Sequence, residues 1–255
     1  MNDQKEKAEL FTSLHKPGDP LILFNIWDAG SAKAVAEAGA KAIATGSWSV
    51  AAANGYADGQ SLPLDLSIEN IRRIADSVDV PVSLDFEGGY AESPDDLRAN
   101  ITRVIEAGAI GINFEDQIVG GTGLYTIDQQ AARIQAIRET AESNKIPLFI
   151  NARTDVFLKT YPAQHDAEQL REAIARAAAY ARAGASGFFA PGLRNPDLIK
   201  ELCEASPIPV NIMVLPDAPP NPELAALGVA RISYGPGPYR QMIDFLKTAA
   251  AKAFN

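Results

Sequence analysis

Two acidic side chains follow a short apolar run that the sequence predicts to be a buried strand. The run covers residues 81–85, and it brings Asp85 and Glu87 to its C-terminal end, just before two glycines. Residues two apart on a strand point to the same side, so both carboxylates should project together and repel each other. A divalent cation with oxygen ligands would offset this repulsion. The alternative is a solvated acidic turn that binds nothing.

Further charged side chains follow other apolar runs of the same kind. Asp58, Glu115 and Arg153 occupy such positions. A group of carboxylates suits Mg²⁺, which keeps several waters and needs few direct ligands. An arginine suits an anionic substrate or a developing oxyanion; the alternative is a structural ion pair with Glu115 or Asp155, and both roles could hold together. Neither histidine follows such a run, and this pattern disfavours zinc.

These residues must be positioned by the elements of the chain, in which short apolar runs alternate with longer helical patterns. Strict alternation of strand and helix predicts a parallel sheet, and eight units fit a (β/α)₈ barrel formed by one domain, residues 1–255. A doubly wound open sheet is the alternative, but no Gly-x-Gly-x-x-Gly follows the first run. The predicted strands lie at 21–25, 41–45, 81–85, 109–114, 147–151, 186–189, 208–212 and 229–232. The predicted helices lie at 29–38, 67–77, 94–106, 127–143, 166–183, 196–204, 222–227 and 238–252.

Composition limits the classes of partner that the protein can have. The 255 residues carry a net charge of −9 with no basic cluster, so we expect neither a nucleic-acid partner nor an anionic membrane surface. No apolar run is long enough to cross a bilayer, and the charged N-terminus has no signal core. The one cysteine, Cys203, excludes a disulfide within the chain and fits a reducing compartment, so we expect a cytoplasmic protein.

Five stretches of the chain resemble the isocitrate lyase / phosphoenolpyruvate mutase superfamily, and most closely its phosphonomutase-like branch. They occur in the family's order, as Asn25-Ile-Trp-Asp-Ala-Gly-Ser31, Ala44-Thr-Gly-Ser-Trp-Ser49, Asp85-Phe-Glu-Gly-Gly-Tyr90, Gly111-Ile-Asn-Phe-Glu-Asp116 and Asn151-Ala-Arg-Thr-Asp155. The resemblance implies an α/β barrel, a small 2-oxo or 2-hydroxy carboxylate substrate bound with Mg²⁺ (Mn²⁺ being a substitute), and an enolate-like intermediate. It also implies a homo-oligomer, a dimer or tetramer, in which the last helix, near 238–252, could pack on a neighbouring subunit.

The resemblance also assigns roles to individual residues. Asp85 matches the principal metal carboxylate, and Asp58, Glu87 and Glu115 match carboxylates that hold the metal through water. Gly46, Ser47 and Trp48 match the loop whose amides bind the substrate carboxylate, and Arg153 and Asn211 match residues that contact substrate. These matches make Arg153 and Glu115 the candidate catalytic residues.

The loop after the fourth predicted strand departs from the family pattern. It reads Gln117-Ile-Val-Gly-Gly-Thr-Gly-Leu-Tyr125, without the cysteine of the lyases or the lysine and asparagine of the mutases. We therefore expect a Mg²⁺-dependent lyase or mutase-type enzyme whose proton donor is unassigned, Tyr125 being one candidate. A phosphonopyruvate or phosphoenolpyruvate P–C bond mutase or hydrolase is the alternative within enzymes. A non-catalytic dicarboxylate-binding barrel is the alternative outside them.

Overall fold

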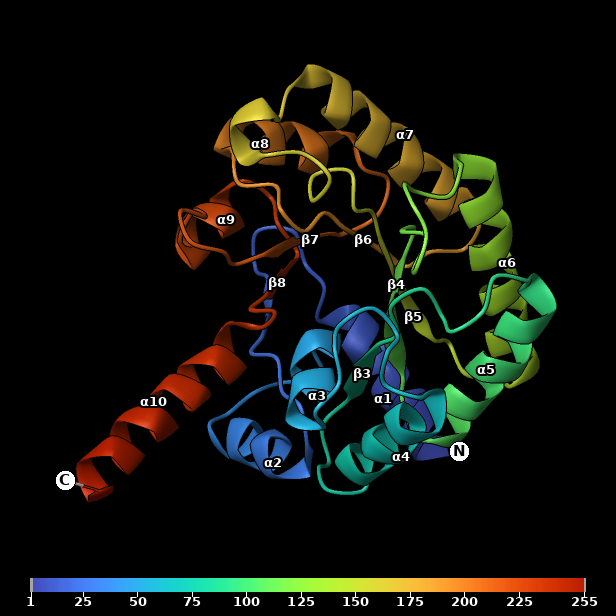
Figure 1. The fold of residues 1–255 in the computed structure, drawn as a ribbon. Helices are drawn as coiled ribbons and strands as arrows, with labels where there is room; N and C mark the ends of the chain where they lie inside the picture. The colour runs from blue at the N-terminus through green and yellow to red at the C-terminus, as the bar shows by residue number, and fades with distance from the viewer. Residues whose placement is uncertain (1, 255) are drawn as a thin grey trace.

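Eight parallel strands form one sheet in the computed structural model, which describes residues 2–254 (Figure 1). Their order is β1-β8-β7-β6-β5-β4-β3-β2, and a parallel bridge between Ile26 and Thr45 joins β1 to β2. This closure confirms the predicted (β/α)₈ barrel. The strands are β1 Leu21–Leu23, β2 Ile43–Ala44, β3 Val82–Asp85, β4 Gly111–Glu115, β5 Phe149–Arg153, β6 Gly187–Phe189, β7 Val210–Met213 and β8 Arg231–Ser233.

Helices alternate with the strands, and the larger ones begin where local sequence signals place them. Ser93 caps α5 by accepting the Asp96 N–H, and Thr126 forms a capping box with Gln129 at the start of α6. None of the described helices combines the length and the apolar character that a bilayer crossing requires. The helices are α1 Asn2–Ser13, α2 Ala29–Glu37, α3 Ser47–Ala53, α4 Leu64–Ala75, α5 Pro94–Glu106, α6 Ile127–Ser143, α7 Ala167–Arg182, α8 Pro196–Ala205, α9 Asn221–Ala226 and α10 Gly237–Phe254, with a 3₁₀ turn at Pro162–Gln164.

Two helices have no counterpart in the sequence prediction. No helix is predicted for the segment of α3, which is rich in serine and alanine, yet Val50 and Ala51 on its buried face anchor it against Leu62. Helix α1 was described from the sequence only as a charged N-terminus. Its buried Phe11 belongs to the main core, so a tertiary contact stabilises a helix whose own apolar pattern is weak.

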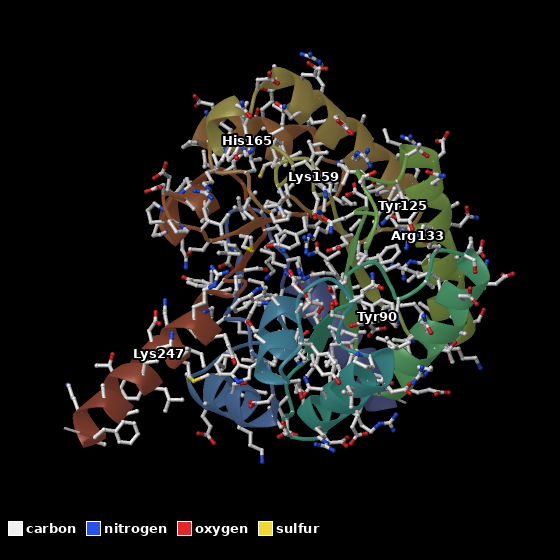
Figure 2. The ribbon with its side chains drawn as sticks, in the orientation of Figure 1. Tyr90, Tyr125, Arg133, Lys159, His165 and Lys247 are labelled. Carbon is white, nitrogen blue, oxygen red and sulfur yellow. The ribbon has the colours of Figure 1, made fainter. Side chains whose placement is uncertain are left out.

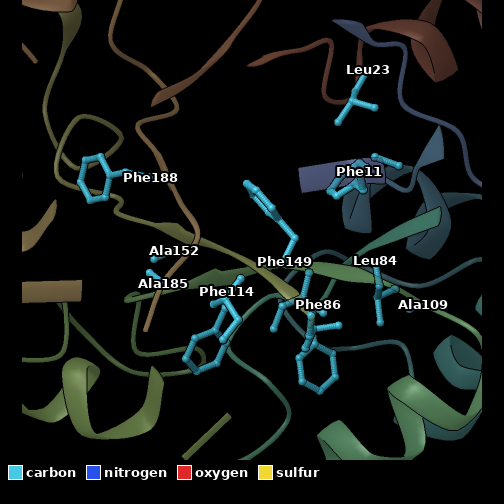
Figure 3. Close-up of a cluster of buried hydrophobic side chains, with 14 of the residues drawn as sticks. Phe11, Leu23, Leu84, Phe86, Ala109, Phe114, Phe149, Ala152, Ala185 and Phe188 are labelled. Atoms are coloured by element: carbon cyan, nitrogen blue, oxygen red, sulfur yellow. The ribbon is translucent and has the colours of Figure 1, made fainter. Parts of the chain in front are cut away.

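Helix α1 also closes the N-terminal end of the barrel. Phe11 packs edge-on against Phe149 with ring centroids 5.3 Å apart, and the His15 ring stacks on Phe149 at 4.0 Å (Figure 3 shows Phe11 and Phe149 in the core). His15 Nδ1 lies 2.8 Å from the Phe11 carbonyl oxygen, and burial lowers the pKa of this histidine to about 3. With this end sealed, the open mouth lies at the C-terminal ends of the strands.

Candidate active site

Asp85 is the last residue of β3, and the neighbouring β2–α3 segment fixes its carboxylate. Its Oδ2 accepts two hydrogen bonds from Ser47, from the N–H at 2.9 Å and the hydroxyl at 2.8 Å. The Asp85 N–H donates to Thr45 Oγ1 at 2.8 Å, which holds the strand end against β2. One carboxylate oxygen is thus oriented by the protein, and the other, Oδ1, has only a long contact of 3.4 Å from Asn113 Nδ2.

Glu87 reaches the same mouth by a route that the sequence did not predict. The strand ends at Asp85, and Glu87 stands in the following turn with a left-handed φ of 50°, which a non-glycine residue adopts only at an energetic cost. Its buried carboxylate accepts the Gln60 N–H at 2.8 Å and the Tyr90 hydroxyl at 3.2 Å. Burial, with the charge of nearby Asp85, raises the pKa of Glu87 to about 7.

Glu115 and Arg153 end the adjacent strands β4 and β5 and form a buried ion pair. The distance from Arg153 Nη1 to Glu115 Oε2 is 2.8 Å, and the Arg153 Nε and Nη2 atoms donate to Asp155 at 2.6 and 2.9 Å. Burial raises the pKa of Glu115, and the Arg153 charge opposes that rise. The ion pairs expected as one alternative for Arg153 therefore exist, and they orient its guanidinium in the mouth.

Asp58 completes the acidic group. It lines a cavity of about 240 Å³ with Asp85 and Arg153, and a second cavity of about 220 Å³ with Glu87 and Glu115. Burial raises the pKa of Asp58, with Asp85 adding to the effect. The structure thus brings together all four carboxylates that the sequence predicted.

The donor set fits Mg²⁺ better than a metal held by protein ligands alone. Within residues 2–254, no three acidic, histidine or cysteine side chains stand close enough to hold one ion directly. Mg²⁺ is bound through one or two carboxylates and keeps several waters, so this spacing suits it. Burial and, after it, the nearby charge of Asp85 raise the pKa of Glu87, and a bound divalent cation would offset both effects.

The predicted substrate-binding residues divide into two groups. Gly46, Ser47 and Trp48 line the cavity of about 240 Å³, but the Ser47 N–H already donates its hydrogen bond to Asp85. First-turn N–H groups of a helix lack an acceptor within the helix, so Trp48 at the start of α3 remains a candidate donor for a ligand. Asn211 is buried and exchanges hydrogen bonds of 3.2 Å with Ser233, which lines the cavity. Its contact with substrate stays a prediction.

Sequence reasoning missed two cations at the mouth and named Tyr125 as one candidate proton donor. Arg240, in the first turn of α10, lines the larger cavity, and Lys159 lines the second one and donates to Gln117 Oε1 at 3.0 Å. Tyr125 instead packs against Arg133, whose guanidinium lies 4.1 Å from the ring centroid (Figure 2). It lines neither cavity that holds the carboxylates. The position of Arg240 after the last strand was the one available signal, because loops after strands face the mouth.

Known proteins share this chain's sequence and fold. A model of the family described as phosphoenolpyruvate phosphomutase matches residues 11–254. The 2-methylisocitrate lyase of Escherichia coli (strain K12) is 29% identical over 214 residues, covering 78% of this chain and 70% of the lyase. A solved structure provisionally named as a phosphonomutase, from Burkholderia cenocepacia J2315, is 50% identical with a TM-score of 0.96, over 98% of this chain and 99% of that one. Phosphonopyruvate hydrolase, solved with oxalate and Mg²⁺, is 21% identical with a TM-score of 0.84, over 96% of this chain and 86% of its own, a likeness of fold alone.

The barrel and its acidic mouth therefore define an enzyme of the isocitrate lyase / phosphoenolpyruvate mutase superfamily. Within that class, the chain belongs to the phosphoenolpyruvate phosphomutase family. The names of its relatives include a lyase and a mutase, so membership by itself does not select one reaction.

Proposed function

We propose that the protein is a Mg²⁺-dependent enzyme that makes or breaks a carbon–carbon bond in a small 2-oxo or 2-hydroxy carboxylate through an enolate intermediate. Mn²⁺ is the alternative ion. The observation that carries the proposal is the meeting of Asp58, Asp85, Glu87 and Glu115 with Arg153 at one barrel mouth. When bound, the ion would supply a Lewis acid that stabilises the negative charge of the enolate.

Each side chain has a role that follows from its surroundings. Asp85, already oriented by Ser47, would hold the ion, and Asp58, Glu87 and Glu115 would reach it through water. Arg153 keeps its charge because Glu115 and Asp155, against the opposing effect of burial, raise its pKa. Its guanidinium would bind substrate oxygens where negative charge develops. Glu115 would act beside Arg153. As its buried partner, Glu115 would hold the guanidinium in place, and it would exchange a proton with the substrate.

Chemistry at a P–C bond is the second candidate, and the name of the 50%-identical structure favours it. The loop at 117–125 offers Gly121 and Gly123 where the mutases carry polar residues, so it has no side chain there to bind a phosphonate. A phosphonate substrate would therefore depend on a cation elsewhere in the mouth, either Lys159, which borders the second cavity, or Arg240, which borders the first.

A binding measurement followed by a turnover screen tests the proposal. We expect oxalate to bind by calorimetry only with Mg²⁺ or Mn²⁺ present, and Asp85→Ala to lose metal binding while keeping its melting temperature. Asp95→Ala, which changes an acidic residue on the exposed start of α5, is the matched control. Screening 2-oxo acids, 2-hydroxy acids and phosphonopyruvate then identifies the bond that is broken. Equal Mn²⁺ affinity in wild type and Asp85→Ala would overturn the metal assignment.

We also propose that the protein works as a homo-oligomer in the cytoplasm. Helix α10 projects from the barrel (Figure 1), and Pro238 at its start is its one buried residue among those described. Ile22 of β1 is correspondingly 38% exposed, although most outward-facing strand residues of a barrel are covered by helices. The location rests on the one cysteine, Cys203, which fits a reducing compartment.

A further inference from the structure

Arg240 brings a positive charge to the mouth that the proposed chemistry has not yet used. It lies in the first turn of α10 and lines the 240 Å³ cavity together with Arg153, Asp85 and Trp48. Arg153 is neutralised by two carboxylates, whereas no acidic side chain among residues 2–254 pairs with Arg240 within salt-bridge distance. Arg240 is therefore free to bind an anionic ligand.

The side chain is held in place by aromatic contacts. Its guanidinium carbon lies 4.6 Å from the centroid of the Trp48 ring, a cation–π arrangement. Tyr239, the preceding residue, packs edge-on against both Trp27 and Trp48, with ring centroids 5.0 and 6.0 Å apart. These contacts fix the first turn of α10 at the rim, so the cation stays over the cavity although the rest of the helix projects outward (Figure 1).

The balance of charges at the mouth indicates a role for Arg240. A divalent ion, Arg153 and Lys159 would bring four positive charges to a mouth lined by five carboxylates, those of Asp58, Asp85, Glu87, Glu115 and Asp155. With all five carboxylates ionised, such a mouth has no positive charge left over for an anion. A substrate with two anionic groups therefore needs another positive charge. Arg240 supplies one on the side away from Glu87 and Glu115, because it borders the first cavity and not the second.

We propose that Arg240 is the specificity-determining residue that binds a second anionic group of the substrate, at the end remote from the metal. The preferred substrates are then 2-oxo or 2-hydroxy acids that carry a distal oxyanion, which a carboxylate or a phosphonate can provide. The planar guanidinium, stacked on Trp48, presents donors in the fork that matches either group. This inference rests on the proposed function, since the metal-binding carboxylates define the other end of the substrate.

Calorimetry with four probes in the presence of Mg²⁺ tests the inference: oxalate and lactate lack a distal anion, whereas malate and 3-phosphonolactate carry one. In wild type, we expect at least one anionic-tailed probe to bind more tightly than lactate. We expect Arg240→Gln to lower the affinity for that probe by about 10- to 100-fold, the loss typical of a charge-assisted hydrogen bond. Oxalate and lactate should change less than threefold. The tailed probe whose affinity falls more identifies the distal group as a carboxylate or a phosphonate.

Lys247→Gln is the matched control, because Lys247 lies on the projecting part of α10 and pairs with Asp244 (Figure 2). It should leave the affinities for all four probes unchanged. The inference is overturned if Arg240→Gln lowers the affinity for all four probes equally, or lowers it for none of them. It is also overturned if wild type binds the tailed probes no more tightly than lactate. Failure of wild type to bind oxalate with Mg²⁺ would instead overturn the proposed function, so the two failures can be told apart.

Discussion

Glu87 combines backbone strain, burial and charge in one residue. Its φ of 50° places the carboxylate in the mouth, where burial and Asp85 raise its pKa to about 7 from 4.5. A carboxyl whose folded pKa is raised favours the folded state below its unfolded pKa, near pH 4.5, and loses that contribution as the pH rises through 7. Above pH 7 the metal-free protein therefore bears the cost of a buried anion, which a cation would relieve.

Metal affinity should accordingly depend on pH near neutrality. Metal ligands must be deprotonated, so we expect the affinity for Mg²⁺ to fall as the pH drops below 7, by up to about tenfold per unit. Glu87→Gln should bind more weakly and with a shallower pH dependence. Titrations at pH 6, 7 and 8 measure both effects, and identical wild-type affinities at pH 6 and 8 would contradict the assignment.

Arg153 and Cys203 separate the proposed chemistry from that of a thiol acid. Cys203 lies in α8 on the outer ring, and burial raises the pKa of its thiol to about 12, so it remains protonated. Steady-state kinetics on the substrate found by screening should show Cys203→Ser unchanged. Arg153→Ala should lower kcat by about 10²–10³, the usual loss for an oxyanion donor.

Arg153→Lys is the folding control for this pair, since it leaves a positive charge beside Glu115 and Asp155. An inactive cysteine variant together with an active Arg153→Ala would show that both the site and the exclusion of a thiol acid are wrong.

The loop at 117–125 has an exposed tip, residues 120–123. It is closed by a bridge between Gln117 and Leu124, and Gly120 and Gly123 take left-handed φ angles of 73° and 83°. Glycines at such positions raise the entropy lost when the loop is ordered. Lys159 donates a hydrogen bond to Gln117, and both residues line the second cavity.

We predict that this loop is a lid that closes on substrate. Limited proteolysis should cut within it in the free protein and slow several-fold when Mg²⁺ and oxalate are added. Mg²⁺ alone, without oxalate, controls for stabilisation by the metal. Cutting at the same rate in all three conditions would argue against a lid.

At the scale of the whole molecule, α10 leaves an apolar surface on the barrel without a covering helix. A groove of about 520 Å³ runs along β1 and α2, with Leu21, Ile22 and Val35 in its lining. On α10 itself, Phe245 is 74% and Leu246 is 56% exposed. Apolar patches that lie on both a projecting helix and an open groove are typical of a contact between copies of one chain.

We therefore predict at least a dimer in which α10 of one copy covers the groove of another. Light scattering at micromolar concentration should give a multiple of the chain mass, and the double substitution Phe245→Glu with Leu246→Glu should give a monomer. Lys247→Glu, next to them on the same helix, should leave the assembly unchanged. A wild-type monomer would refute the prediction.

The sequence by itself determined the order and the type of most elements, because their signals are local. Apolar runs and 3.6-residue periodicity reproduced the eight strands and eight of the helices, and the residues predicted for α5 agree with its bounds, Pro94–Glu106. It also predicted positions after strands for the four carboxylates and Arg153, and these residues meet at one mouth because loops after barrel strands lie together. The resemblance then supplied roles that no periodicity contains.

Only the tertiary structure decided which side chains meet. The hydrogen bond from Ser47 to Asp85 and the approach of Arg240 to Trp48 join residues that lie 38 or more positions apart. The turn that places Glu87 depends on one backbone angle, the φ of that residue. The contacts of Tyr239 with Trp27 and Trp48 at the start of α10 likewise join residues far apart in the sequence. Local patterns carry no information about such contacts, because closure of the sheet alone sets the distance between strands remote in sequence.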